Sequence, residues 1–353
     1  MERRTFLKTV GTVAGSYALG SGPLLRAQAA GLVREHLGLP QRVLGRTGAR
    51  VSVVGFPGLA LANYDQAQGT AGLHRAFDQG INYFDVAPAY GKDGDAEIKM
   101  GIGLQGIDRS RIFLACKTKM RDKDGARMEL ERSLKRLKTD YFDLYQMHAI
   151  FTEDEVKQAL GPNGALETFL KARDEGKIRH FGFSAHTTAG AVAALNGFAF
   201  DCVMFPLSFV DYFDSGFGKA VIESATEKGA AVVAIKALSK GSWPQGVERT
   251  RRWWYRTTEE QKETDLAVHF TLSLPGVVAA IPPSWLDLVD KAIEAGRSLR
   301  PITETETLEL RRIAGDCQPL FREEPRQVAA DCPRDHHIDP DCPHHPGAAT
   351  PVG

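Results

Sequence analysis

Four side chains with acid–base chemistry follow three consecutive apolar runs of this chain. They are Asp85 and Tyr90 after the first run, Lys117 near the end of the second and His148 at the end of the third. A phenol is a weak proton donor near neutral pH, and a neighbouring ammonium favours its phenolate form. A histidine can donate a hydrogen bond to an oxygen that gains negative charge. These four types are suited to placing a proton on a substrate oxygen.

The three runs have the composition of buried β-strands. They are found within Gly80–Gly91 (GINYFDVAPAYG), Ile112–Thr118 (IFLACKT) and Phe142–His148 (FDLYQMH). Apolar, β-branched and aromatic residues dominate them, as is typical of strands. Each acid–base residue has an ordinary structural interpretation by itself, such as a loop tyrosine, an interior histidine or an ion pair. Their arrival at three successive strand ends favours a shared site.

Strands and helices alternate along most of the chain. The expected strands are Val51–Phe56, the run at Ile81, Ile112–Thr118, Phe142–His148, Ile178–Ser184, Cys202–Leu207, Ala231–Ala237 and Val277–Ile281. The helices are expected at Thr70–Gln79, Asp95–Gly103, Gly125–Lys138, Gly164–Glu175, Thr188–Leu195, Gly218–Lys228, Thr258–Leu274 and Trp285–Ala295. This alternation predicts an α/β fold, a (β/α)8 TIM barrel whose chemistry lies at the carboxyl ends of its strands. A β-hairpin around Thr47–Gly48 should precede the barrel, and a helix at Thr303–Ala314 should follow it.

Composition and segment boundaries divide the 353 residues into three expected parts: a signal peptide at 1–30, the barrel at 31–315 and an irregular tail at 316–353. Lys and Arg together number 44, as do Asp and Glu, so the formal net charge is zero. This balance favours neither a nucleic acid nor a membrane surface as partner. No apolar run reaches the roughly 18 residues of a membrane span, so we expect no integral membrane segment.

The amino terminus has the pattern of an export signal. Residues 1–8 read MERRTFLK, with paired Arg3 and Arg4, and a Gly/Ala-rich stretch leads to a small-residue cleavage pattern at 27–29. This pattern resembles a twin-arginine signal, which is removed and lies outside the fold. We therefore expect the twin-arginine translocation machinery as a partner and a periplasmic or otherwise exported location.

The hairpin, GINYFDVAPAYG, the CKT ending and DYFDLYQMH occur in an order that resembles the aldo-keto reductase family over roughly 41–313. The resemblance implies an NAD(P)H-dependent oxidoreductase that reduces a small-molecule aldehyde or ketone. It implies Tyr90 as the general acid, Lys117 as the group that adjusts the Tyr90 pKa, and Asp85 as the partner of Lys117. His148 is implied to orient the carbonyl. The carbonyl substrate and the oligomeric state are left open.

The resemblance also places cofactor contacts after the later strands, at Ser184, His186, Met204, Lys236, Pro282 and Ser284. Ala185 stands where the family has asparagine, and Ile235-Lys236 stands where it has an aromatic residue and serine. The IPPSW segment at 281–285 lacks the lysine that grips the 2′-phosphate. We expect NADP(H), with NAD(H) as the alternative.

Two other functions fit the same barrel. A protein with weakened cofactor contacts could be a cofactor-binding sensor or partner module. Lys236 at a strand end could instead form a Schiff base, as in barrel lyases and aldolases. The loop Arg249–Arg256 (RTRRWWYR) is expected beside the barrel mouth.

The tail is rich in proline, cysteine and histidine. We expect no metal site in the barrel; the weaker candidates for zinc or copper are Cys332, His336, Cys342 and His344. Thiol and imidazole side chains are suitable ligands, although their spacing matches no established zinc or iron–sulfur pattern. An irregular tail, or one closed by a disulfide, is the other interpretation.

Overall fold

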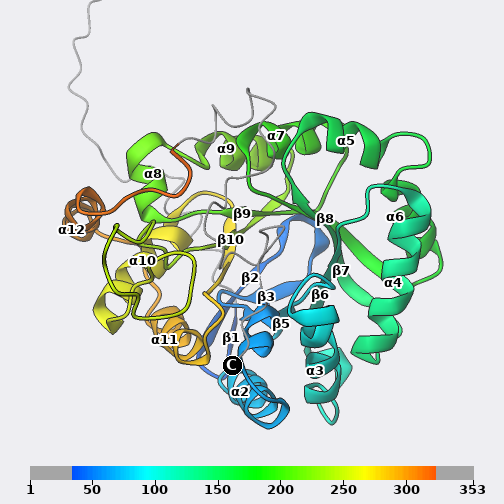
Figure 1. The fold of residues 1–353 in the computed structure, drawn as a ribbon, viewed down its shortest axis with the longest axis horizontal. Coiled ribbons are helices and arrows are strands. Elements are labelled where there is room, and N and C mark those ends of the chain that lie inside the picture. Colours follow the sequence, from blue (N-terminus) through cyan, green and yellow to red (C-terminus); the bar gives the residue numbers. More distant parts are fainter. Residues whose placement is uncertain (1–33, 323–353) are drawn as a thin grey trace, which may run out of the picture.

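The computed structural model describes residues 34–322, in which a ring of helices surrounds eight parallel strands (Figure 1). The strands are β4 (Phe56–Pro57), β5 (Tyr83–Asp85), β6 (Phe113–Thr118), β7 (Phe142–Ile150), β8 (Ile178–Ala185), β9 (Cys202–Pro206), β10 (Ala231–Ile235) and β11 (Val277–Ile281). Each strand pairs with the next in sequence. The ring closes at a parallel bridge between Val54 and Ala280, where the Gly55 amide donates to the Ala280 carbonyl over 3.0 Å. The predicted (β/α)8 barrel is confirmed.

The helices cover the outside of the ring. They are α2 (Gln66–Asp78), α3 (Asp95–Gly103), α4 (Lys123–Leu137), α5 (Glu153–Leu160), α6 (Ala165–Asp174), α7 (Thr188–Gly197), α8 (Phe209–Ser215), α9 (Lys219–Glu227), α10 (Gln261–Ser273), α11 (Leu286–Arg297) and α12 (Glu304–Gly315). Local sequence explains where several begin. Asp65 and Gln68 form a capping box at α2, and the Asp122 side chain caps α4. Such caps satisfy amide groups that have no partner within the helix.

Three differences from the predicted elements concern the barrel's strand ends and loops. The first barrel strand was expected at 51–56 but is only Phe56–Pro57, because residues 50–52 belong to β3 of the separate small sheet. Strand β10 ends at Ile235 rather than at Ala237, so Lys236 lies just beyond the strand. Two short helices, α5 and α8, were not predicted; they lie in the loops after β7 and β9.

The predicted hairpin is present within a three-stranded antiparallel sheet of β1 (Arg34–His36), β2 (Leu39–Val43) and β3 (Arg50–Ser52). Arg42 donates to the Val277 carbonyl at the start of β11 over 2.6 Å. Asn82, just before β5, accepts from the Ser52 amide over 2.7 Å. These contacts place the sheet at the amino ends of the strands, where buried Leu44 joins the inner core. The sheet therefore leaves the carboxyl ends of the strands, at the opposite end of the barrel, uncovered by the hairpin.

Strand side chains alternate between the barrel interior and the helix layer. Tyr83, Phe113, Ala115 and Leu144 pack in one buried cluster inside the ring, whereas Phe84, Leu114 and Tyr145 pack in the larger cluster beneath the helices. Continuing the inward series one step toward the carboxyl ends reaches the polar residues of the site. Alternation therefore directs these polar side chains inward.

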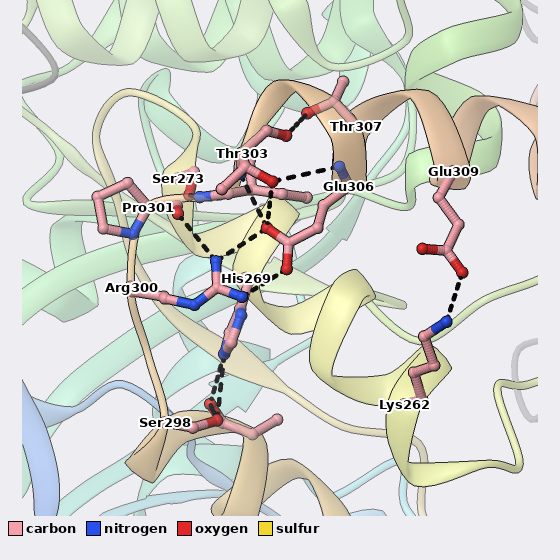
Figure 2. A network of polar contacts seen from close by, with 12 residues as sticks. Lys262, His269, Ser273, Ser298, Arg300, Pro301, Thr303, Glu306, Thr307 and Glu309 are labelled. Atoms are coloured by element: carbon pink, nitrogen blue, oxygen red, sulfur yellow. Dashed lines mark hydrogen bonds and ion pairs between the residues drawn. The ribbon is translucent and has the colours of Figure 1, made fainter.

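Helix α12 lies outside the ring beside α8 and α10 (Figure 1). Its first turn is fixed by the Thr303–Glu306 capping box, and Arg300 binds the Glu306 carboxylate over 2.5 and 2.8 Å (Figure 2). Lys262 of α10 donates to Glu309 of α12 over 2.9 Å. The predicted helix at Thr303–Ala314 is confirmed, and these contacts tie it to the barrel.

The described start of the predicted tail, residues 316–322, returns to the barrel. Gln318 forms a parallel bridge with Gly241, and the buried Phe321 ring stacks on Phe217 with centroids 4.5 Å apart. The export signal at 1–30 and the tail candidates Cys332, His336, Cys342 and His344 lie outside the described residues. Within residues 34–322, no helix has both the length and the apolar composition needed to cross a membrane.

Candidate active site

The side chains of Asp85, Tyr90 and Lys117 meet at the carboxyl end of the barrel. Asp85 is the last residue of β5, and Lys117 comes from the neighbouring strand β6. Tyr90 follows β5 on a tight turn in which its amide donates to the Ala87 carbonyl over 3.0 Å. The Lys117 ammonium donates to the Asp85 carboxylate and, over 3.1 Å, to the Tyr90 hydroxyl. The structure thus brings together residues from two different strand ends.

Burial controls the electrostatics of this trio. Lys117 and Asp85 are almost wholly inaccessible to solvent. Burial alone would lower the pKa of Lys117, but the charge of Asp85 and its contacts with Tyr90 outweigh this effect and hold the pKa above its ordinary value. Lys117 is therefore an ammonium ion at neutral pH.

The net shift of the Tyr90 pKa is upward, whereas an ammonium neighbour alone was expected to lower it. Burial raises its pKa above the ordinary value of 10.0, and the opposing effect of the Lys117 charge does not cancel this rise. The Lys117 charge lowers the Tyr90 pKa, as predicted, but the loss of hydration of the phenolate raises it by more. Tyr90 is consequently a protonated hydrogen-bond donor through the neutral range.

His148 reaches the site through an irregularity at the end of β7. The pairing of β7 with β8 shifts register between Met147 and Ile150, and Ala149 adopts a left-handed backbone with φ of 56°. A bulge of this kind redirects neighbouring side chains. The buried His148 ring packs edge-to-face against the Tyr90 ring, with centroids 5.6 Å apart and an interplanar angle of 87°. All four predicted catalytic residues therefore lie together.

Two supporting residues were not predicted from the sequence. Gln146 donates its side-chain amide to the Asp85 carboxylate over 3.3 Å. Arg121 donates to the carbonyl oxygens of His148 and Ala149 over 2.7 and 3.0 Å, which fixes the bulge. The alternation of β7 offered a signal for Gln146, since it shares the inward face with His148 two residues later. Nothing in the local sequence around Arg121 indicated its contact across 27 residues.

A cavity opens beside the trio at the barrel mouth. It is lined by Pro57, Leu59, Asp85, Tyr90, Ile235, Lys236, Trp253, Trp254, Tyr255, Ile281, Pro282, Pro283 and Ser284. Most of this lining is apolar or aromatic, and the polar groups are few, as in small-molecule sites. The expectation that the loop Arg249–Arg256 lies beside the mouth is confirmed, because three of its aromatic residues form one wall.

The six predicted cofactor residues separate into two groups. Lys236, Pro282 and Ser284 line this cavity with Tyr90. Ser184, His186 and Met204 are buried and are not among the cavity-lining residues. The Ser184 hydroxyl accepts from the Ala149 amide over 2.8 Å, and the His186 ring stacks on Phe151 at 5.5 Å. Met204 packs within the inner barrel core.

Neither metal binding nor catalysis by the strand thiols is indicated in the described part of the chain. Within residues 34–322, no cluster of three or more His, Cys, Asp or Glu side chains is arranged to hold a metal ion. Cys116 and Cys202 are free thiols buried within strands, where burial raises the pKa of both. Such thiols are poor nucleophiles. The candidate reactive groups at the cavity are therefore those of the Tyr90 site and Lys236.

The family model described as "Aldo/keto reductase family" matches residues 56–312, which include the whole barrel and the site. This chain belongs to the aldo/keto reductase family. In this aldo/keto reductase barrel, Asp85, Tyr90, Lys117 and His148 lie together at the carboxyl ends of the strands.

Individual curated relatives of this aldo/keto reductase match it over less than half of its length. "Uncharacterized oxidoreductase YqkF" of Bacillus subtilis is 32% identical over 157 residues, covering 41% of this chain and 48% of the relative. "6-dehydroglucose reductase" of Novosphingobium aromaticivorans is 32% identical over 173 residues, covering 44% and 55%. The chain spans about half the length of these curated relatives.

Solved structures match over a larger share. The aldo-keto reductase AKR11C1 from Bacillus halodurans in its holo form has a TM-score of 0.62 and 25% identity, covering 78% of this chain and 96% of that one. An aldo-keto reductase from Klebsiella pneumoniae in complex with NADPH has a TM-score of 0.60 and 21% identity, covering 77% and 94%. At 21% identity, the likeness to the Klebsiella pneumoniae structure shows a shared fold.

Proposed function

We propose that this aldo/keto reductase reduces an aldehyde or ketone to an alcohol with NAD(P)H, and that Tyr90 is the proton donor. The observation that carries the proposal is the contact of the Tyr90 hydroxyl with the Lys117 ammonium, 3.1 Å away, at a cavity of largely apolar lining. When bound, the reduced nicotinamide supplies the hydride that is added to the carbonyl carbon.

The protein's own residues handle the proton and the charge. Tyr90 donates its proton to the carbonyl oxygen, so the substrate gains one hydride and one proton and becomes an alcohol. The Lys117 ammonium stabilises the phenolate left on Tyr90, and Asp85 holds Lys117 in place. His148, packed on the Tyr90 ring, is the second donor for the carbonyl oxygen. Solvent then returns the proton to Tyr90.

The cavity is chemically suited to a nicotinamide. Ile235, Ile281 and Pro282, at the ends of β10 and β11, are apolar lining residues that would contact the ring. Ser284 adds a hydroxyl to the lining. The NADPH complex of the Klebsiella pneumoniae protein supports NADP(H) as the cofactor, with NAD(H) as the alternative.

A fluorescence titration with NADPH and NADH tests the cofactor part of this proposal. Trp253 and Trp254 line the cavity, so bound nicotinamide should quench their emission. Saturable quenching should be accompanied by consumption of the reduced cofactor when aldehydes and ketones are added. Absence of binding to either cofactor, verified by calorimetry, would overturn the proposal.

A Schiff-base lyase is the second candidate, because Lys236 lines the same cavity as Tyr90. An imine between a lysine and a carbonyl substrate is reduced by borohydride to a stable adduct. Substrate-dependent mass gain at Lys236 after borohydride treatment would favour the lyase. Cofactor consumption without such a gain favours the reductase.

The export signal belongs to the same proposal. The MERRTFLK sequence supports translocation of the folded protein by the twin-arginine machinery. A double substitution, Arg3→Lys with Arg4→Lys, should retain the protein in the cytoplasm of a bacterial host, whereas the unaltered chain should reach the periplasm. Equal distribution of both chains on fractionation would contradict export by this route.

A further inference from the structure

Strand β7 has an extra residue where it delivers His148 to the site. Residues 147–150 advance three steps along β7, whereas their pairing partners, residues 183–185, advance two steps along β8. The extra step includes Ala149, whose φ of 56° lies in the left-handed region. This conformation costs a non-glycine residue energy and persists only where the surrounding structure imposes it. The contacts that impose it on Ala149 therefore also fix the backbone of its neighbour, His148.

Arg121 binds both carbonyl groups of this bulge. It lies in the loop between β6 and α4, and its side chain is only 9% exposed. Its Nη2 atom donates to the His148 carbonyl over 2.7 Å and to the Ala149 carbonyl over 3.0 Å. These carbonyls belong to the two peptide groups that flank Ala149, so one guanidinium holds the strained residue from both sides. The Nη1 atom donates to the Lys119 carbonyl over 3.1 Å, which fixes the guanidinium itself.

Two further side chains anchor the same segment. The Glu155 carboxylate of α5 lies 3.8 Å from the Arg121 guanidinium and accepts from the amides of residues 151–152 over 2.8 and 3.2 Å. The Ser184 hydroxyl of β8 accepts from the Ala149 amide over 2.8 Å. Side chains from three separate parts of the chain thus hold the backbone directly after His148.

The backbone held by Arg121 determines the position of the His148 imidazole. His148 is buried, and its ring packs edge-to-face on Tyr90 with centroids 5.6 Å apart. Rotation of the peptide group after His148 would change the direction of the side chain and the distance between the two rings. A displacement of about 1 Å at a catalytic group can cost roughly 100-fold in rate. Arg121 is thus placed to influence catalysis without touching the reacting atoms.

We propose that Arg121 is a positioning residue of the reductase, which acts through His148 by holding the strained bulge that places the imidazole beside Tyr90. This inference rests on the proposed reductase function. Arg121 is not among the residues that line the cavity, so we assign it no contact with substrate or cofactor. The competing interpretation is a purely structural role as the ion-pair partner of Glu155, and the experiment separates the two.

A double-mutant cycle between Arg121 and His148 tests this role, with the full chain, NADPH and benzaldehyde. Arg121→Met should lower kcat by roughly 10- to 100-fold when His148 is present. In the His148→Ala background the same substitution should change kcat by less than about twofold, because no imidazole remains to be positioned. The loss in the free energy of unfolding should be equal in the two backgrounds. Equal losses of kcat in the two backgrounds would make Arg121 purely structural and overturn the proposal.

Arg109 provides a matched control at the opposite end of the same two strands. It likewise donates to two backbone carbonyls, those of Ile112 and Tyr141 just before β6 and β7, over 3.1 and 2.9 Å. It also pairs with a buried carboxylate, that of Asp143, over 2.8 Å. Arg109→Met should therefore lower the free energy of unfolding but leave kcat within about twofold of the unaltered value.

A nuclear Overhauser effect between the His148 and Tyr90 rings gives a readout that needs no turnover. In deuterated protein with protonated histidine and tyrosine rings, the effect should be present in the unaltered chain and in Arg109→Met. It should be lost in Arg121→Met, and its retention there overturns the proposal. A protein that binds no NADPH or reduces no benzaldehyde would count against the proposed function, whereas the ring contact tests Arg121 independently.

A second substitution covers the case in which Arg121→Met does not fold. Arg121→Lys keeps a cation beside Glu155 but lacks the planar guanidinium that holds the bulge. We expect a weaker ring contact and a lower kcat than in the unaltered chain, with a smaller loss of stability than in Arg121→Met. A ring contact and kcat equal to those of the unaltered chain would show that only the charge beside Glu155 is needed, which overturns the proposal.

Discussion

The Lys117 ammonium donates to the Tyr90 hydroxyl over 3.1 Å while it also binds the Asp85 carboxylate. One buried cation thus joins a proton donor on a loop to a carboxylate at a strand end. In the proposed mechanism these contacts separate two tasks: Asp85 keeps Lys117 charged, and Lys117 stabilises the phenolate that forms on Tyr90. Each of the first three predictions below depends on this contact.

Tyr90→Phe should lower kcat by about 10²- to 10⁴-fold, the range contributed by a positioned general acid. The ring and its packing on His148 remain, so the dissociation constant for NADPH should change by less than about twofold. Steady-state kinetics and fluorescence titration measure the two quantities. Tyr64→Phe is the control, because Tyr64 also uses its hydroxyl, accepting from the Leu286 amide over 3.1 Å, but lies outside the cavity lining. Unchanged turnover in Tyr90→Phe would exclude Tyr90 as the acid.

Removal of one member of the Lys117–Asp85 pair should reduce stability as well as activity. Both side chains are buried, so Lys117→Met leaves a carboxylate without its counterion and should lower the free energy of unfolding by about 3–5 kcal/mol. The double variant Lys117→Met with Asp85→Asn removes both charges and should recover much of that loss without recovering turnover. Urea unfolding and kinetics measure the two effects. A double variant as unstable as the single one would show that the unpaired charge is not the cause of the lost stability.

The raised pKa of Tyr90 predicts the direction of the pH dependence. Carbonyl reduction needs protonated Tyr90, so its rate should be level through neutral pH and fall only as pH rises above about 10. Alcohol oxidation needs the phenolate, so its rate should keep rising as the pH increases to about 10. Rate profiles from pH 6 to 11 in both directions measure this. An oxidation rate that levels off below pH 8 would instead mean that the phenol pKa is lowered in the working enzyme.

The contact of Gly241 with the segment at 316–322 can be tested by a matched pair of substitutions. A Cβ at Gly241 would lie 1.9 Å from the Gln318 carbonyl oxygen, whereas one at Gly246 would meet no atom within 4 Å. The two glycines have φ of +77° and +76°, so Gly241→Ala and Gly246→Ala share the same backbone strain. We expect Gly241→Ala to cost about 1–3 kcal/mol more in the free energy of unfolding.

Hydrogen exchange identifies where that cost arises. The Ser242 amide donates to the Gln318 carbonyl over 2.7 Å, and the Phe321 amide donates to Asp211. Both amides should exchange faster in Gly241→Ala and remain protected in Gly246→Ala. Equal protection in the two variants would show that the segment tolerates the added methyl group.

The sequence alone was sufficient for the barrel and for the four catalytic candidates. Strand and helix patterns are local, and in a parallel barrel the order of strands along the chain is also their order in space. A residue at the end of β5, β6 or β7 therefore has to face the same mouth. Alternation along the strands sets which side chains point inward. Asp85, Lys117 and His148 were predictable for this reason.

Only the tertiary structure decided the direction of the Tyr90 pKa shift and the long-range contacts that support the site. The net direction of the Tyr90 pKa depends on how deeply the phenol is buried, which no local pattern specifies. The Lys236 ammonium lies near Trp254 and Phe321, two rings from distant parts of the chain, and Arg121 fixes the β7 bulge through backbone carbonyls of another element. These contacts are made by loops and by the end of the chain, whose paths depend on packing rather than on residue periodicity. The barrel determines where chemistry can occur, and the packing of its loops determines which ligand can enter.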